Sequence, residues 1–289
     1  MSDWSGKSRG NALGYWFFIF FMKNFGMGFT YAFLHFVALY FFLFSWSSSK
    51  WIYKYYRTGL NYGGVKSITG IYKTYYVFGQ VIIDKVAMAS GIKDRFNLTH
   101  NGAEVIRNMV ENKTGGILIS GHIGNWEIAS HLMRGYGGVV NVVMYDEEHQ
   151  KIKKHIDETT GGRKFNVIPI KDDISHVFLI SKAILNKELV CIHGDRFRDG
   201  MRTLKKDFLD QEAQFPYGPF AIAAKFDVPK TFVYGFKTGT YDYSFYATEP
   251  IEGKLKPELL LTNYVDEMEK MVRKYPNQWF NFYDFWKAK

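Results

Sequence analysis

The sequence predicts an α/β fold, with a largely parallel central sheet flanked by helices and an N-terminal apolar membrane anchor. Short β-branched runs alternate with helical stretches from residue 116 onward, a pattern typical of parallel strands joined by crossover helices. Residues 27–46 form an apolar run in which His35 and the tyrosines are the only ionisable groups. The chain of 289 residues is also long enough to bury a substantial core.

Two apolar runs near the N-terminus predict an uncleaved membrane anchor over residues 1–46. The first, 13–22, is too short to cross a bilayer, whereas 27–46 would form a helix of about 30 Å, the thickness of the hydrocarbon core. The apolar region is too long for a signal peptide, and no small-residue cleavage pattern follows it. Basic residues lie on both sides of it. One spanning helix and a re-entrant or interfacial pair therefore both remain open.

Residues 47–289 are predicted to form one α/β domain. Its first part, 51–113, is expected to be helical, with interruptions at Gly63-Gly64, Gly79 and Gly91. Buried strands are predicted at 116–120, 139–145, 165–170 and 189–193, and helices at 125–134, 147–160 and 174–187. Two more strands, 230–237 and 241–248, are predicted to form a hairpin around Thr238-Gly239, followed by a closing amphipathic helix at 257–274.

The net charge of +9 and its distribution restrict the partners. A basic balance suits an anionic partner such as a membrane surface or an acidic carrier protein. The Lys and Arg residues are scattered, without a dense basic stripe or a recognisable nucleic-acid-binding motif, so no nucleic-acid partner is expected. Cys191 is the only cysteine, which excludes an intrachain disulfide and a cysteine-based zinc site.

The stretch 116–130 contains the residues best suited to catalysis. The predicted strand ends at Ser120, and His122 follows it, at the carboxyl edge of the sheet where α/β proteins bind ligands. A histidine there can act as a general base, because its unperturbed pKa of about 6.5 lies near neutrality. Glu127, in the first turn of the next helix, is expected to fold back onto the imidazole and hold its tautomer. We therefore expect His122 to be the base and Glu127 its orienting partner.

Four neighbouring residues are expected to contact the substrate. Gly121 and Gly124 would let a substrate approach the backbone closely. Asn125 is a reasonable helix N-cap, and the amides of Asn125 and Trp126 are candidate donors to an oxyanion. A bare His-x-x-x-x-Glu spacing is common and also fits a helix start without a catalytic role. The surrounding strand and glycine-containing turn are what favour the catalytic interpretation.

The motif Gly-His-x-Gly-Asn-Trp-Glu at 121–127 resembles the active-site motif of the lipid A late acyltransferases and their lysophospholipid acyltransferase relatives. Further blocks follow in the family's order, at 191–196, 208–224, 228–229 and 276–279. The resemblance implies that 47–289 is an α/β acyltransferase domain at the bacterial inner membrane, facing the cytoplasm. It also implies an acyl donor carried by acyl carrier protein or CoA, a lipid acceptor, and no metal or other cofactor.

Two departures from the family pattern bear on the acceptor. Tyr145 is followed by the acidic run 146–148, where lipid A acyltransferases have Arg-Pro. These carboxylates predict an acceptor with less phosphate than a lipid A precursor, because like charges repel. The alternative is that they only begin the helix 147–160, where negative charge suits the helix dipole. The second departure is the Asp-Arg pair at Asp195 and Arg196, where many members have Asp-Gln. Both residues are expected in substrate binding. Arg196 would meet a phosphate or the developing charge of the intermediate, or else form a loop salt bridge with Asp195.

We therefore predict a membrane-associated O-acyltransferase that moves a fatty acyl group from a thioester to a lipid hydroxyl. A thioesterase or other hydrolase would use the same histidine to activate water, but the apolar anchor and the lack of a Gly-x-Ser-x-Gly elbow count against it. A catalytically inactive membrane scaffold would not need both His122 and Glu127. His193, just before the Asp195 loop, is expected to have a structural role.

Overall fold

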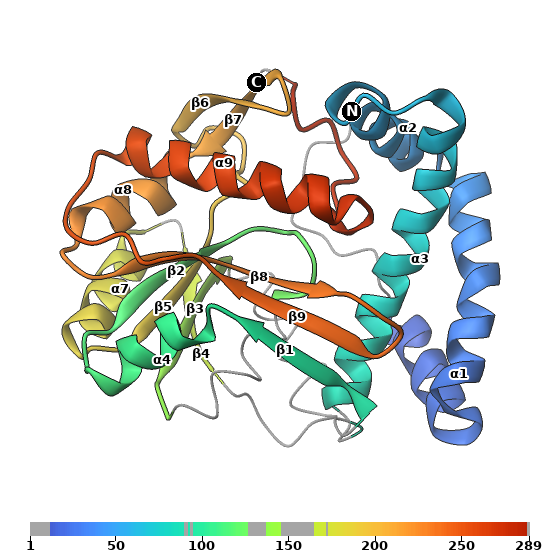
Figure 1. Ribbon diagram of the computed structural model, residues 1–289, viewed down its shortest axis with the longest axis horizontal. Coiled ribbons are helices and arrows are strands. Elements are labelled where there is room, and N and C mark those ends of the chain that lie inside the picture. The colour runs from blue at the N-terminus through green and yellow to red at the C-terminus, as the bar shows by residue number, and fades with distance from the viewer. Residues whose placement is uncertain are drawn as a thin grey trace.

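The computed structural model describes residues 12–89, 92, 95–126, 137–145, 165–171 and 173–287. Glu127, the acidic run 146–148 and the predicted helix 147–160 lie outside the described residues, as does all but the start of the predicted helix 125–134. Within the described ranges the predicted α/β architecture is confirmed. A seven-stranded, mostly parallel sheet lies between layers of helices (Figure 1).

The central sheet has the strand order β1-β9-β8-β2-β5-β3-β4. Neighbouring strands are parallel except for β8 and β9, which form an antiparallel hairpin. The strands are β1 (Asn97–Asn101), β2 (Gly116–Ser120), β3 (Val140–Tyr145), β4 (Asn166–Ile170), β5 (Leu189–His193), β8 (Lys230–Lys237) and β9 (Asp242–Ala247). All but β1 match their predicted ranges to within one residue, because each is a short run rich in β-branched or aromatic residues.

Three strands were not predicted. β1 falls in the region that was expected to be helical, and its sequence is mostly polar because it lies at the exposed edge of the sheet. β6 (Thr203–Phe208) and β7 (Gln211–Pro216) form a separate hairpin. Its turn residues Leu209 and Asp210 both have positive φ, as a two-residue type I′ turn requires. None of these three strands contains the run of apolar β-branched or aromatic residues from which the other six strands were predicted.

Helices cover both faces of the sheet. α4 (Ala103–Glu111) packs in the core layer that contains Leu118. α7 (Ser175–Leu185), α8 (Tyr217–Lys225) and α9 (Pro257–Lys274) contribute to the opposite layer, which contains Ile117 and Ile119. Successive residues of β2 point to opposite faces, so this one strand supports both layers. Figure 1 shows α9 above the sheet and α4 below it. The predicted ranges of α7 and α9 are confirmed.

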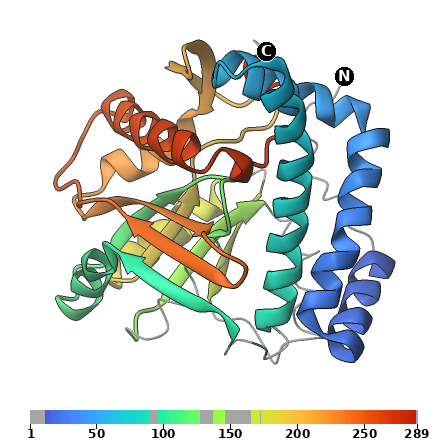
Figure 2. The same ribbon diagram turned by 45° about the vertical axis from the view of Figure 1, so that its right-hand side comes forward.

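The N-terminal helices stand side by side along one end of the sheet (Figures 1 and 2). They are α1 (Ala12–Phe44), α2 (Trp46–Lys54), the π-helix η1 (Tyr55–Gly59) and α3 (Gly64–Ala89). α1 bends at Gly26, where φ is 81°. The predicted interruption at Gly79 is wrong, because α3 continues through it. A side chain at Gly79 would overlap Leu34 of α1, so the glycine lets the two helices approach closely.

Candidate active site

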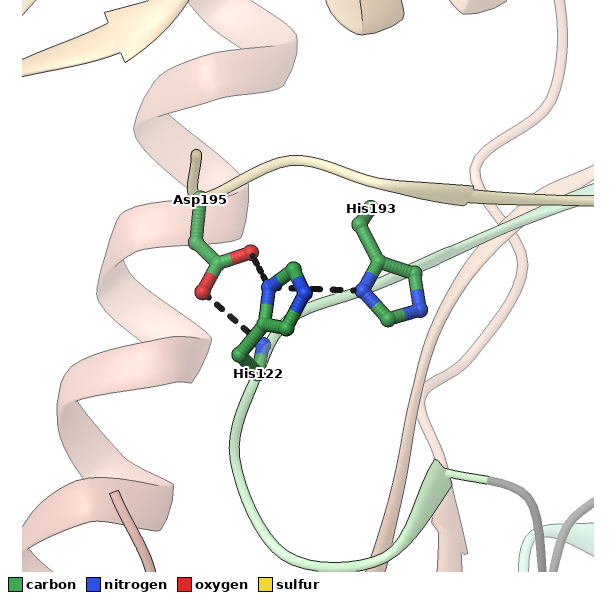
Figure 3. Close-up of side chains that lie close together, drawn as sticks. All are labelled: His122, His193 and Asp195. Atoms are coloured by element: carbon green, nitrogen blue, oxygen red, sulfur yellow. Dashed lines mark hydrogen bonds and ion pairs between the residues drawn. The ribbon is translucent and has the colours of Figure 1, made fainter. Parts of the chain in front are cut away.

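The ends of two neighbouring parallel strands bring the central residues of the site together. β2 ends at Ser120 and β5 at His193, and these two residues are paired in the sheet register. His122 follows β2 by two residues, and Asp195 follows β5 by two residues. The two loops are also tied by a hydrogen bond from the Gly194 amide to the Ser120 carbonyl, at 2.9 Å. His122, His193 and Asp195 therefore meet at the carboxyl edge of the sheet (Figure 3).

Asp195 holds His122 at two points. The Nδ1–H of His122 donates to Asp195 Oδ1 at 2.8 Å, and the backbone N–H of His122 donates to Oδ2 at 2.8 Å. The carboxylate is buried, with 1% of its side chain exposed. Burial alone raises the pKa of Asp195, but the neighbouring His122, through electrostatics and its hydrogen bond, outweighs this together with Arg196 and holds the pKa well below its usual range. An ionised Asp195 fixes Nδ1 as the protonated nitrogen, which leaves Nε2 as the basic one.

His193 packs directly against the imidazole of His122. The two rings meet edge to face with centroids 4.6 Å apart, and the ring of Trp126 meets His193 from another side at 5.1 Å. The Nδ1 atoms of the two histidines are 3.5 Å apart. Burial, together with the electrostatic effect of the neighbouring His122, lowers the pKa of His193 to about 3. His193 is therefore neutral at physiological pH. Sequence analysis expected only a structural role for it and missed this contact.

The orienting partner that sequence analysis assigned to His122 was Glu127, which lies outside the described residues. The carboxylate that the structure places against Nδ1 is Asp195, which had been assigned to substrate binding. A carboxylate in this position stabilises an imidazolium and selects a tautomer, which is the role that had been expected of Glu127. The role of Glu127 stays a prediction.

The two glycines of the turn have packing roles that the sequence did not reveal. Gly124 has φ of 65°, and a side chain there would overlap the carbonyl oxygen of Gly235 in β8. A side chain at Gly121 would lie 2.7 Å from the hydroxyl of Tyr264 and 3.3 Å from Cγ of Asp195. Both glycines thus let the His122 turn sit close to its neighbours. Direct contact of either glycine with a substrate stays a prediction.

The backbone of the turn is held by neighbouring carbonyls. The Gly124 amide donates to Gln278 at 2.7 Å, in the short helix η4 (Pro276–Gln278), and the Asn125 amide donates to Gly235 at 2.6 Å. The Asn125 N–H is therefore occupied, which corrects its predicted role as an oxyanion donor. The side chain of Asn125 is buried, whereas Trp126 lines the cavity described next.

A cavity of about 290 Å³ opens beside His122. Most of its wall is hydrocarbon, supplied by Val142, Val143, Met144, Ile170, Ile180, Ile192, Met201, Pro216, Pro219 and Ile222. Polar groups on the wall include His122, His193, Arg196 and Arg202, and no acidic side chain lines it among the described residues. The space suits a ligand with a long apolar part and a reacting group near the histidines.

Arg196 connects the site to the C-terminal segment. Its Nη2 donates to the Phe280 carbonyl at 2.9 Å, and its Nε lies 3.9 Å from Asp195 Oδ2. The predicted loop salt bridge is therefore present as a long contact, and the same side chain lines the cavity as the phosphate-binding alternative would need. The guanidinium also adds positive charge beside Asp195, which helps to keep that carboxylate ionised.

His122, His193 and Asp195 also have the spacing of metal ligands. One potential ligand atom from each lies within 4.8 Å of the others. Asp195 however accepts hydrogen bonds from His122 through both of its oxygens. The geometry of the described side chains is that of a hydrogen-bonded pair with a histidine packed beside it.

One comparison with known proteins assigns a family to the chain. A family model described as bacterial lipid A biosynthesis acyltransferase matches residues 71–288. Among solved structures, the chain is similar to the crystal structure of the 1-acyl-sn-glycerophosphate (LPA) acyltransferase PlsC from Thermotoga maritima. The identity is 16%, the match covers 86% of this chain and 97% of that chain, and the TM-score is 0.39. No curated protein matches the chain.

Proposed function

Because the chain belongs to the bacterial lipid A biosynthesis acyltransferase family and is an acyltransferase, we propose that it esterifies a lipid hydroxyl with a fatty acyl group. The acyl group comes from a thioester of acyl carrier protein or CoA. The observation that carries the proposal is the hydrogen-bonded pair of His122 and Asp195 beside a mostly apolar cavity.

The proposed reaction begins with proton transfer from the acceptor hydroxyl to Nε2 of His122. The hydroxyl oxygen attacks the thioester carbonyl and forms a C–O bond, while the imidazolium is stabilised by Asp195. The tetrahedral intermediate then expels the thiolate by breaking the C–S bond, and His122 returns the proton to sulfur. The products are an ester and a free thiol, with no net change in oxidation state.

Glu127 remains part of the proposal as a second carboxylate near His122. Its place in the motif 121–127 puts it close in sequence to the base. Trp126 and Arg196 line the cavity, which supports a role for them beside the acyl group. Arg196 is the better candidate to meet the negative charge that develops on the thioester oxygen, because its guanidinium is always charged.

The cavity wall supports a fatty acyl group as the transferred unit. Its hydrocarbon side chains come mainly from the strands β3, β4 and β5 and from the helices α7 and α8. Each buried methylene contributes about 0.8 kcal/mol, so an acyl tail would gain binding free energy in proportion to its buried length. A thioester carbonyl beside His122 would then place the tail along this wall.

The location also forms part of the proposal. Asn24–Phe44 is, among the described residues, a helical stretch long and apolar enough to cross a membrane. An anchor over residues 1–46 would hold the catalytic domain at the cytoplasmic face of the bacterial inner membrane, where thioester donors and a lipid acceptor meet. The acidic run 146–148 favours an acceptor with less phosphate than a lipid A precursor.

The test is acyl transfer by purified full-length protein, with acyl carrier protein and CoA thioesters as donors and a panel of hydroxylated lipids as acceptors. His122→Asn should lower ester formation about 10²–10⁴-fold, since this is the usual contribution of a general base. His100→Asn is the matched control, because His100 is exposed on the edge strand β1. Glu127→Gln tests the second carboxylate. Ester formation by His122→Asn at the wild-type rate would contradict the mechanism, and free fatty acid as the main product would favour the hydrolase alternative.

A further inference from the structure

As far as Ile83, the N-terminal segment carries basic but no acidic side chains after Asp3. Between Trp4 and Ile83 the sequence contains no Asp or Glu, but it contains eight basic residues: Lys7, Arg9, Lys23, Lys50, Lys54, Arg57, Lys66 and Lys73. The first acidic residue after Asp3 is Asp84, which is buried. A surface built from this segment therefore attracts anions and offers no acidic side chain to repel them.

One side of α1 is an exposed aromatic face, formed by Phe25, Phe29, Phe36, Tyr40 and Phe44 together with Trp46 at the start of α2. Phe36 is 71% exposed and Trp46 is 78% exposed. Only 28% of the apolar window in Asn24–Phe44 is buried within the protein. Large aromatic side chains at this density on a surface mark contact with another apolar phase or with a partner. The adjoining Lys50 and Arg57 are also exposed, so this surface combines aromatic and basic side chains.

The opposite side of α1 is fixed to the rest of the protein. Met27, Leu34 and Ala38 are buried, and Leu34 packs over Gly79 of α3. In the middle of the helix, the hydroxyl of Tyr31 donates to the buried carboxylate of Asp84, and the same carboxylate pairs with Lys237 of β8 at 2.7 Å. α1 therefore packs along α3, as Figure 2 shows, and contacts the β8–β9 hairpin through Tyr31.

This packing is incompatible with a helix that crosses the bilayer. A spanning helix over Asn24–Phe44 would place its midpoint, Leu34, near the bilayer centre, with Tyr31 less than one helical turn away. Tyr31 stacks on Tyr241, whose carbonyl accepts a hydrogen bond from Asn97 at the start of β1. The open edge of the sheet would then lie in hydrocarbon, where unpaired backbone groups are not tolerated. Lys73 is exposed on α3 and would enter the same region.

We propose that α1 lies in the plane of an anionic phospholipid surface, with its aromatic face in the lipid and both of its ends on the side that holds the catalytic domain. Of the two anchors that the sequence leaves open, this is the interfacial one. Aromatic side chains enter the boundary between headgroups and acyl tails, while the lysines and arginines meet anionic headgroups. The inference rests on packing and charge and does not depend on the acyl-transfer chemistry.

A series of contacts links the N-terminal helices to the active site. Phe78 of α3 packs against Phe280 with ring centroids 5.0 Å apart, and the Phe280 carbonyl accepts a hydrogen bond from Arg196. Arg196 in turn lies beside Asp195. Figure 2 shows the central parallel strands pointing toward α3 at their carboxyl ends. An α1 that lies flat on the membrane therefore holds the site close to the lipid.

The first test locates both ends of the apolar stretch Asn24–Phe44 of α1. Because the native Cys191 is buried, a cysteine introduced at an exposed position can be labelled selectively. Full-length Asn24→Cys, Ser47→Cys and Lys254→Cys variants are treated with a membrane-impermeant maleimide in sealed inner-membrane vesicles of both orientations. Lys254, exposed before α9, reports the side that holds the catalytic domain. We expect all three to be labelled from the same side without detergent. Labelling of Asn24→Cys or Ser47→Cys only from the side opposite to Lys254→Cys would overturn the proposal.

The second test measures lipid binding by vesicle flotation of the purified full-length protein. Vesicles of phosphatidylcholine mixed with phosphatidylglycerol should bind it at least ~10-fold more strongly than phosphatidylcholine alone, and salt should reduce the difference. The double variant Phe36→Ser/Tyr40→Ser should bind at least ~10-fold more weakly. Leu259→Ser is the control, because Leu259 is exposed on α9. Equal binding to both vesicle types, or wild-type binding by the double variant, would contradict the assigned surface.

Discussion

The carboxylate of Asp195 accepts two hydrogen bonds from His122, one from the backbone N–H and one from Nδ1, each at 2.8 Å. The hydrogen bond to the backbone fixes the position of the His122 main chain. The hydrogen bond to Nδ1 fixes the orientation of its imidazole ring. A single buried carboxylate thus controls both the position and the tautomer of the proposed base.

Asp195→Asn should lower the rate of ester formation about 10²–10⁴-fold without unfolding the protein. The amide keeps an oxygen for the backbone N–H of His122, but it removes the negative charge that stabilises the imidazolium. Steady-state kinetics measure the rate, and chemical denaturation checks that the variant is folded.

The control for this variant is Asp210→Asn, because the Asp210 side chain is 93% exposed in the β6–β7 turn. It changes the net charge equally but should leave the rate unchanged. An Asp195→Asn enzyme with the wild-type rate would show that Asp195 only packs against the turn.

Gly124→Ala should destabilise the protein by at least about 2 kcal/mol, because it adds strain at a positive φ to an overlap with the Gly235 carbonyl. Gly63→Ala is the matched control, since a side chain there meets nothing within 4 Å. Chemical denaturation measures both. Equal stability of the two variants would mean that the His122 turn can relax away from β8.

The described part of the sheet was largely predictable, because strands such as β2 and β5 are uninterrupted apolar runs. β1 was missed because its five residues are mostly polar, and only its pairing with β9 makes it a strand. A pattern of apolar residues in a sequence reflects buried side chains, and the side chains of this edge strand are mostly exposed.

The active site was predictable only in part. His122 could be found from its local context of strand, turn and glycine. Its pairing with Asp195 could not, because the two lie 73 residues apart and the register of β2 against β5 brings them together. The same register places His193 against the imidazole. The packing roles of Gly121 and Gly124 depend on the neighbouring segments for the same reason.

Stability should fall as the pH is lowered through the range in which His193 titrates in the unfolded chain. The pKa of His193 is about 3 in the folded protein and near 6.5 when unfolded, so between these values the unfolded chain binds the extra proton. At pH 5.5 this favours unfolding by about 1 kcal/mol relative to pH 7.5. In His193→Gln that contribution should disappear, which denaturation at the two pH values tests. An unchanged pH dependence would contradict a neutral, enclosed His193.

Ile222→Trp should shift acyl-chain selectivity toward shorter donors. Ile222 lines the cavity from α8, so a larger side chain shortens the space for the tail. Each methylene that can no longer be buried costs about 0.8 kcal/mol, roughly fourfold in kcat/KM. Ile174→Trp, at an exposed position before α7, should keep the wild-type selectivity. A parallel loss for all chain lengths would place the acyl tail elsewhere.

The buried pair of Asp84 and Lys237 should behave as one unit. Their side chains are 0% and 5% exposed, and the pair joins α3 to β8 at 2.7 Å. Removing one partner leaves a buried charge, so Lys237→Met should cost about 3–5 kcal/mol. The double variant Asp84→Leu/Lys237→Met should recover part of this loss, because no unpaired charge remains. Denaturation of the wild type, both single variants and the double variant gives the coupling free energy.

Lys237→Met should also depend more steeply on pH than the wild type does. Burial raises the pKa of Asp84 even beside Lys237, and without the lysine the pKa rises further. The folded variant then keeps the proton that the unfolded chain releases near pH 4. Its stability is therefore highest below that pH and falls as the pH rises through the folded pKa. Relative to the wild type, Lys237→Met should be less destabilised at pH 5 than at pH 8. A deficit equal at both pH values would mean that Asp84 stays ionised, held by the hydroxyls of Tyr31 and Tyr243 alone.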